Sequence, residues 1–348
     1  MAESPSSLTW LLEHGLASLA APLETLTSAQ SRLYWGYLAA ALVIAATVYV
    51  VRETRAAPFS WRGLARFVWP KSVWLHPSSI LDYKFVVIDL VLFTLALGPF
   101  VVSSYAVADG VGAGLRVMFG APDSAQSAGF VLIALFTVSL VVVADLIRFL
   151  CHALMHHVPM LWEFHKVHHS AKALTPATLF RAHPLEKFLM ASATGIAFGL
   201  VLGVFEYVAP QDLTMLTVLG VNVVLFAFFS WANLSHSHVW LSFGRRAEHV
   251  ILSPAQHQVH HSDAPQHRHK NLGSIFALWD WAFGTLYIPP AQERLSFGLG
   301  SKEDEAFSSV WRIYTYPLRR ALRQAAYGGA MITEDQYRDK RAQTSDAL

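Results

Sequence analysis

The chain has 348 residues, of which 54% are hydrophobic and only 14% charged, with a formal net charge of +2. Typical soluble domains carry about 25% charged residues, so this composition excludes an ordinary soluble enzyme, a disordered chain and a coiled coil. The small net charge also argues against a surface that binds nucleic acid. The 17 histidines accompany a single cysteine, which excludes an internal disulfide and a four-cysteine metal site. Any bound metal must therefore depend on imidazole and carboxylate ligands.

Five apolar stretches are long enough to cross a membrane once flanking residues are included. They cover residues 34–51, 85–102, 129–144, 188–205 and 213–234. A sixth stretch, 272–288, contains Asp280 and bulky aromatics, so we expect it to be buried or interfacial. The N-terminal region lacks the features of a cleavable signal peptide, and we expect residues 8–23 to lie on the membrane surface. The expected fold is an all-α, integral-membrane helical bundle.

Lysine and arginine are concentrated in alternate connecting loops. They are rare before residue 34 and in the loops 103–128 and 206–212, but frequent in the loops after the first and third stretches and from residue 237 onward. Positive charge favours the cytoplasmic side of a membrane. Five spans with an outside N-terminus then place the basic loops and the C-terminal part in the cytoplasm, as a multi-pass membrane protein.

Fifteen of the 17 histidines lie between His152 and His269. Most belong to three clusters, in which the spacings i, i+3 and i+4 predict one helical face of imidazoles each. Eight imidazoles exceed the ligand set of one ion, so two metal ions are the simplest division. The clusters are His152 and His156, then His165, His168 and His169, and finally His257, His260 and His261.

The predicted spans bring these clusters to one side of the membrane. The first lies at the end of the third span, the second follows in the same loop, and the third follows the fifth span together with His236 and His238. We therefore expect a cytoplasmic, histidine-rich helical cap in which the eight clustered histidines are catalytic metal ligands. His236, His238 and His183 are further candidate ligands.

The remaining polar residues of this region receive other interpretations. Asp145 lies seven residues before His152, two helical turns earlier on the same face, and we expect it to accept a hydrogen bond from a ligand imidazole. A structural role is expected for the other histidines, which are His14, His76, His157, His249, His267 and His269.

Several motifs resemble the sterol desaturase and fatty acid hydroxylase superfamily of membrane, histidine-rich diiron oxygenases. The resemblance covers roughly residues 80–290. It depends on DLIRFLCHALMH at 145–156, LWEFHKVHHS at 161–170, HPLE at 183–186, HQVHHS at 257–262, NLG at 271–273 and WDWAFGT at 279–285. The chain departs from the common pattern at Ala153, at Leu272 and at His238, where many relatives have Arg, an aromatic residue and Asn.

This resemblance implies an enzyme with two iron ions (Fe²⁺) that uses O2 to hydroxylate or desaturate a C–H bond of a lipid such as a sterol, a fatty acyl chain or a carotenoid. One cysteine cannot hold an iron-sulfur cluster, and the chain has no G-x-G-x-x-G motif. We therefore expect an external electron donor, either a ferredoxin, a cytochrome or a reductase. The expected parts are an N-terminal interfacial segment with the first membrane helix (1–80), a diiron membrane domain (81–290) and a cytoplasmic tail (291–348).

Two other functions are compatible with the histidines. A membrane zinc hydrolase would need a general base, for which Glu163 and Glu186 are the nearby carboxylates. A divalent-metal transporter would instead place imidazoles near the middle of the bilayer, whereas these clusters are expected at or beyond helix ends.

Overall fold

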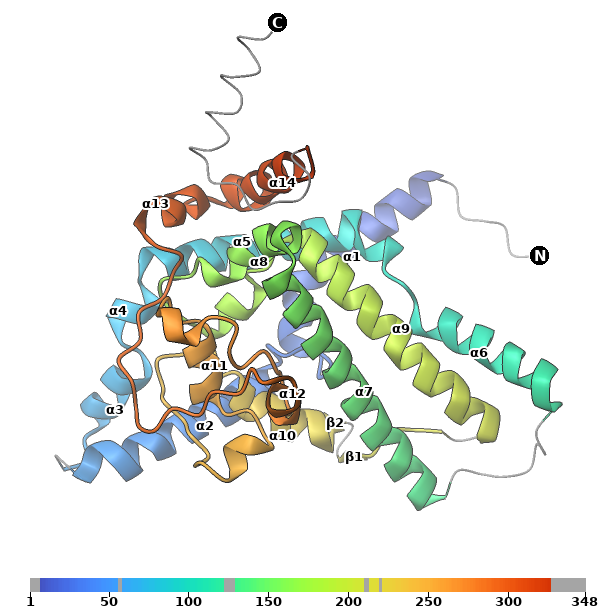
Figure 1. Cartoon of the computed structure of the whole chain (residues 1–348), viewed down its shortest axis with the longest axis horizontal. Coiled ribbons are helices and arrows are strands. Elements are labelled where there is room, and N and C mark those ends of the chain that lie inside the picture. Colours follow the sequence, from blue (N-terminus) through green and yellow to red (C-terminus); the bar gives the residue numbers. More distant parts are fainter. Residues whose placement is uncertain (1–6, 56–57, 122–128, 210–212, 219–220, 327–348) are drawn as a thin grey trace, which may run out of the picture.

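The computed structural model describes residues 7–55, 58–121, 129–209, 213–218 and 221–326. Helices dominate these ranges, and the predicted all-α fold is confirmed. Two very short strands, β1 (Thr217–Val218) and β2 (Val221–Asn222), pair antiparallel near one end of the molecule. The architecture is a set of long apolar helices with a cap of shorter helices and loops at one side (Figure 1).

Among the described residues, three helices are long and apolar enough to cross a membrane: α2 (Trp35–Arg52), α7 (Phe130–His157) and α9 (Pro184–Val208). They coincide with the first, third and fourth predicted stretches. A fourth candidate consists of α5 (Pro77–Ala96) and the following segment Gly98–Phe119, which is bent by 48° relative to α5. The chain is therefore that of a membrane protein, as its composition predicts.

One predicted span is wrong, and another is part of a longer, bent candidate. The second stretch, 85–102, breaks at η2 (Gly98–Phe100), and helix α6 (Ser104–Phe119) occupies what was expected to be a loop. In the described part of the fifth stretch, 213–234, the two strands are followed by the ten-residue helix α10 (Val223–Ala232). Asn222 caps α10 by accepting hydrogen bonds from the backbone N–H groups of Val224 and Leu225, so the helix begins too late to span a bilayer. The cytoplasmic location of the histidines, which relied on five spans, stays a prediction.

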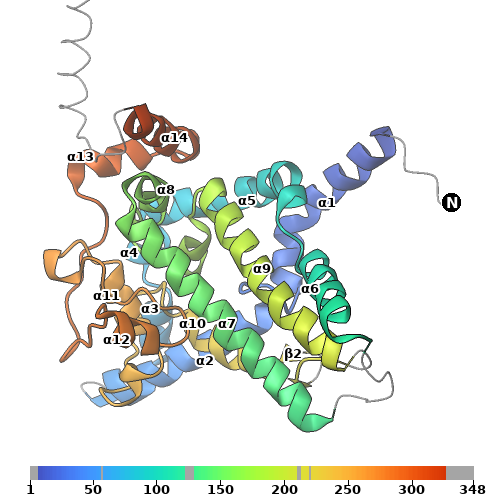
Figure 2. The same ribbon diagram turned by 45° about the vertical axis from the view of Figure 1, so that its right-hand side comes forward.

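Helices α6, α9 and α7 lie side by side (Figures 1 and 2). Glycines recur every four residues on α9 at Gly195, Gly199 and Gly203, facing α6. A Cβ atom at Gly199 would lie 2.5 Å from the backbone oxygen of Ser104, so the two backbones are in direct contact there. Small residues at this spacing are typical of close helix packing in membranes.

Shorter elements complete the chain. In the N-terminal part they are α1 (Ser7–Thr27), which packs on α5, η1 (Glu53–Arg55), α3 (Trp61–Val68) and α4 (Lys71–Trp74). In the C-terminal part they are α8 (Pro159–His169), η3 (Pro176–Phe180), η4 (Ala247–His249), α11 (Pro254–His260), η5 (Pro265–His267), α12 (Leu278–Phe283), α13 (Ser301–Asp304), η6 (Glu305–Phe307) and α14 (Val310–Ala326).

Helix α14 packs against α8 (Figures 1 and 2). The contact centres on the buried carboxylate of Glu163. Its Oε1 accepts hydrogen bonds from Lys166 Nζ at 3.1 Å and from Gln324 Nε2 at 2.7 Å, and it forms an ion pair with Arg320 at 3.5 Å. The C-terminal part of the chain thereby fixes the outer side of the helix that carries the second histidine cluster.

Candidate metal centre

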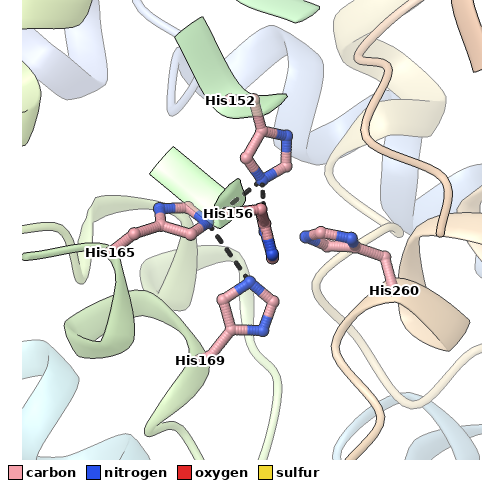
Figure 3. A group of neighbouring side chains, drawn as sticks. All are labelled: His152, His156, His165, His169 and His260. Atoms are coloured by element: carbon pink, nitrogen blue, oxygen red, sulfur yellow. Dashed lines mark hydrogen bonds between the residues drawn. The ribbon is translucent and has the colours of Figure 1, made fainter. Parts of the chain in front are cut away.

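Nine histidines form two compact groups, and within each group the candidate ligand atoms lie within 4.8 Å of one another. Figure 3 shows the first group, whose rings point toward a common centre. The first group consists of His152, His156, His165, His169 and His260. The second group consists of His168, His236, His257 and His261.

The two groups share helices. The last turns of α7 supply two rings to the first group, while α8 supplies His165 and His169 to the first group and His168 to the second. Helix α11 and its C-cap supply one ring, His260, to the first group and two rings, His257 and His261, to the second. Each cluster does lie on a helix, as predicted, but α8 and α11 each turn rings toward both groups.

Backbone carbonyl groups orient two rings of the first group. His152 Nδ1 lies 2.7 Å from the oxygen of Leu272, and His260 Nδ1 lies 2.8 Å from the oxygen of Lys270. Because a carbonyl oxygen only accepts, Nδ1 of each ring carries the proton. Nε2 of each ring is therefore an unprotonated acceptor, which is the form that binds a metal ion.

Carboxylates hold two further rings, one directly and one through an arginine. Glu186 Oε1 accepts a hydrogen bond from His165 Nδ1 at 2.7 Å. In the second group, His168 Nδ1 donates to the backbone oxygen of Arg181 at 3.3 Å, and the guanidinium of Arg181 forms a buried ion pair with Asp82 at 2.7 Å. Such outer contacts fix the tautomer and the orientation of metal-binding imidazoles.

The loop that presents the carbonyl groups of Lys270 and Leu272 has an unusual backbone conformation. His269 and Asn271, on either side of Lys270, have positive φ angles of 56° and 55°. Asp280 of the WDWAFGT motif stabilises this loop, because its carboxylate accepts from the backbone N–H groups of Leu272 at 2.7 Å and Gly273 at 2.8 Å. Positive φ at residues other than glycine persists where surrounding contacts enforce it, often at functional sites.

Asp145 does not contact an imidazole, so its predicted role is wrong. Its carboxylate accepts hydrogen bonds from the backbone N–H groups of Ile275 at 2.8 Å and Phe276 at 3.0 Å and from the indole of Trp279 at 2.9 Å. It therefore anchors the 275–279 segment to α7, next to the loop that orients His152. Glu186 of the HPLE element makes the kind of contact that was expected of Asp145.

Several ring nitrogens inside each group lie 3.0–3.2 Å from one another. His165 Nε2 lies 3.0 Å from His152 Nε2 and 3.2 Å from His169 Nε2. With the proton of His152 on Nδ1, its Nε2 has only a lone pair to offer, and His260 Nε2 is buried without any hydrogen-bond partner. In the second group, the Nε2 atoms of three rings lie 3.1–3.2 Å from His236 Nε2. This donor set fits a metal ion in each group.

Burial keeps these rings neutral. Burial, followed by the neighbouring imidazole of His152, lowers the pKa of His168 to about 3. Burial, followed by the proximity of other imidazoles, also places the pKa well below the usual histidine value in six more rings, those of His165, His169, His236, His257, His260 and His261. Neutral imidazole at physiological pH is the state that metal binding requires.

Two of the predicted ligands lie outside both groups. His183 Nδ1 accepts from the backbone N–H of Leu185 at the start of α9, and its Nε2 donates to the oxygen of Tyr314. His238 Nε2 donates to the oxygen of Phe67 at 2.6 Å. Both rings therefore have structural contacts instead, although His236, two residues before His238, belongs to the second group.

The remaining histidines lie outside both groups, as expected. His76 caps α5, His157 and His249 bond to carbonyl groups one turn earlier, His267 pairs with Glu293, and His269 packs on the ring of His157. The side chain of His14 lies outside the described residues.

Comparisons with known proteins show what the segment that holds the two groups is similar to. Residues 137–285 match the family model described as fatty acid hydroxylase. The ornithine lipid hydroxylase OlsE of Rhizobium tropici is 25% identical over 48% of this chain and 46% of its own length. Alkylglycerol monooxygenases of Danio rerio and Caenorhabditis elegans are 25% and 23% identical, over 42% and 49% of this chain.

These matches cover 29% and 32% of the two alkylglycerol monooxygenases, so the chain spans less than half the length of the curated relatives it matches. No solved structure matches the chain. The matched segment 137–285 contains all nine grouped histidines. The predicted resemblance to the sterol desaturase and fatty acid hydroxylase superfamily is thereby confirmed.

Proposed function

We propose that this protein is a membrane-bound, O2-dependent hydroxylase that acts on a C–H bond of a lipid. The observation that carries the proposal is the pair of buried histidine groups inside the fatty acid hydroxylase segment, next to the end of a membrane helix. The names of the relatives support both the reaction and the substrate class of the proposal. Each relative is a hydroxylase or a monooxygenase, and the names mention two classes of lipid.

Two iron ions are the proposed cofactor, one held by the five rings of the first group and one by the four rings of the second. Bound iron would supply the redox chemistry that activates O2, which no side chain of the protein provides. Hydroxylation consumes O2, two electrons and two protons, and it yields the hydroxylated lipid and water. The electrons would come from a separate ferredoxin, cytochrome or reductase.

The protein's own residues would orient the ligands and keep water out. Leu272, Lys270 and Glu186 hold the Nδ1 atoms of their partner rings, so each Nε2 faces the centre of the first group. The indole of Trp162 covers this group, with its ring 5.1 Å from that of His156 and 5.4 Å from that of His169. A site closed in this way protects a reactive centre from bulk water.

Metal analysis combined with one substitution tests the proposal. We expect two iron ions per purified chain, and His260→Ala should lose iron and lipid hydroxylation together. His249→Ala is the matched control, because His249 lies outside both groups and its Nδ1 bonds to the backbone oxygen of Arg245. Normal iron content in the His260 variant would remove this residue from the centre. Comparing the lipids of cells with and without the gene should reveal the substrate as the precursor of a missing hydroxylated species.

The zinc-hydrolase alternative has less support from the positions of its two candidate bases. Glu163 is buried among Lys166, Arg320 and Gln324 on the α14 side of α8, and Glu186 is bonded to His165. Zinc as the bound metal, together with turnover in the absence of O2, would favour that alternative over the hydroxylase.

A further inference from the structure

An apolar cavity of about 290 Å³ lies between α2 and the 233–239 segment. A second cavity of about 270 Å³ continues it toward α3, and the two share Leu42, Val68 and Trp69. The lining residues on α2 run from Leu38 to Ala46, which corresponds to about 12 Å along the helix. The size and the apolar lining are typical of a small-molecule site.

Two residues that line the first cavity each carry a buried hydrogen-bond acceptor without a partner. Asn233 Nδ2 donates to the oxygen of Arg32 at 3.1 Å, which fixes the orientation of the amide, and Asn233 Oδ1 is buried without a hydrogen bond. His238 Nε2 donates to the oxygen of Phe67, so its buried Nδ1 is an acceptor, also without a partner. By contrast, Ser237 in the same lining bonds within its own turn. Unsatisfied buried acceptors are costly, and a ligand with a donor group would satisfy them.

The lining of the cavity extends from a candidate membrane helix to the segment of the chain that contains His236. Helix α2 is a candidate membrane span, and the side chains of Trp61 and Trp69 at the cavity are 78% and 52% exposed, as expected of aromatic residues at a membrane interface. On the other side, the lining residues Asn233 and His238 lie three residues before and two residues after His236, which belongs to the second group. A lipid could therefore enter from the membrane along α2 and place its polar end next to this group.

We infer that the two cavities form the binding site for the lipid substrate, with its alkyl chain along α2 and with a hydroxyl or amide N–H group that donates to Asn233 Oδ1 or His238 Nδ1. The assignment of the lipid as substrate rests on the proposed function, whereas the binding site itself does not. His238 thus has a recognition role in place of the metal-binding role that its position in the sequence suggested.

Photolabelling of the purified, iron-loaded protein tests this inference without turnover. The probe is dodecanol with a diazirine in the middle of the chain, and labelled peptides are identified by mass spectrometry. We expect labels on residues 38–46 and 61–74. Unlabelled dodecanol should compete about tenfold better than dodecane, the order of effect expected when a hydrogen bond is formed with a buried acceptor.

Two neighbouring substitutions on α2 provide the matched comparison. Leu42→Trp should fill the shared part of the cavities and abolish labelling, while Val43→Trp should leave it intact, because Val43 is exposed and lines neither cavity. Labelling elsewhere in the chain, or equal labelling of both variants, would refute the site. Equal competition by alcohol and alkane would refute the recognition of a donor. Iron content and hydroxylation are measured separately from labelling. Labelling at this site without iron or hydroxylation would refute the proposed function but not the binding site, whereas hydroxylation without labelling here would refute the binding site but not the function.

Discussion

Replacing Glu186 with alanine should weaken metal binding in the first group more than in the second. The substitution removes the hydrogen bond that Glu186 Oε1 accepts from His165 Nδ1 at 2.7 Å. Loss of such an outer contact to a metal-binding imidazole typically lowers metal affinity about 10- to 100-fold. The first group should thus lose affinity by this factor.

A chelator titration of the iron-loaded protein measures this effect. The wild type and the Glu186→Ala variant are incubated with increasing concentrations of a ferrous chelator, and the iron retained per chain is determined at each step. We expect half of the iron of the variant to leave at a chelator concentration about 10- to 100-fold lower, with the other half retained as in the wild type. Glu186→Gln, which keeps an acceptor oxygen but no charge, should show a smaller loss.

Glu206→Ala is the matched control, since Glu206 lies on the same helix but is exposed. Unchanged retention of both irons in Glu186→Ala would refute the argument that the carboxylate strengthens His165 as a ligand. Equal weakening of both irons, with an unchanged thermal unfolding midpoint, would refute the assignment of Glu186 to the first group alone.

Three further predictions concern packing, the loop anchor and acid. Gly199→Leu should destabilise the fold by about 1–3 kcal/mol, because the new side chain would clash with the backbone of Ser104. Gly114→Leu, at a position with open space, should not destabilise it. Thermal unfolding in detergent measures the stability of both variants. Asp145→Ala should leave two backbone N–H groups unpaired and lower the iron content without removing a ligand. The metal-free protein should lose stability as the pH falls below about 6.5, because histidines of the unfolded chain then bind protons. The buried rings of the folded protein do not, since their pKa is lowered, in His168 to about 3. An unchanged unfolding midpoint between neutral and mildly acidic pH would contradict this.

The long helices and the participation of histidine could be predicted from the sequence because both follow from local patterns. An uninterrupted apolar stretch is sufficient to predict α7 and α9. The i, i+4 spacings of His152 with His156 and of His257 with His261 suffice to predict that these rings share a helical face. The division of the third cluster between two groups, however, depends on how α11 is rotated relative to α8, and this rotation is not encoded in the spacing.

Contacts between distant segments explain the predictions that were wrong. The heptad spacing of Asp145 and His152 does place them on one side of α7, but the partners of Asp145 come from a loop about 130 residues later. Composition also cannot separate a membrane helix from an apolar segment that starts as a hairpin, which is why residues 213–234 were misinterpreted. His236 and His238 differ only in the geometry of one turn, and no periodic pattern distinguishes them.

The contact between α8 and α14 has a consequence for biosynthesis. A chain leaves the ribosome from its N-terminus, so the helices that carry His156 and His165 are made well before the residues that hold them in place. The carbonyl group that orients His152 belongs to Leu272, and the partner of Glu163 on the outer side of α8 is Gln324. Iron delivered during synthesis would therefore meet an incomplete set of oriented ligands. Loading should be a late event, after the helices have entered the membrane and the C-terminal segment has docked.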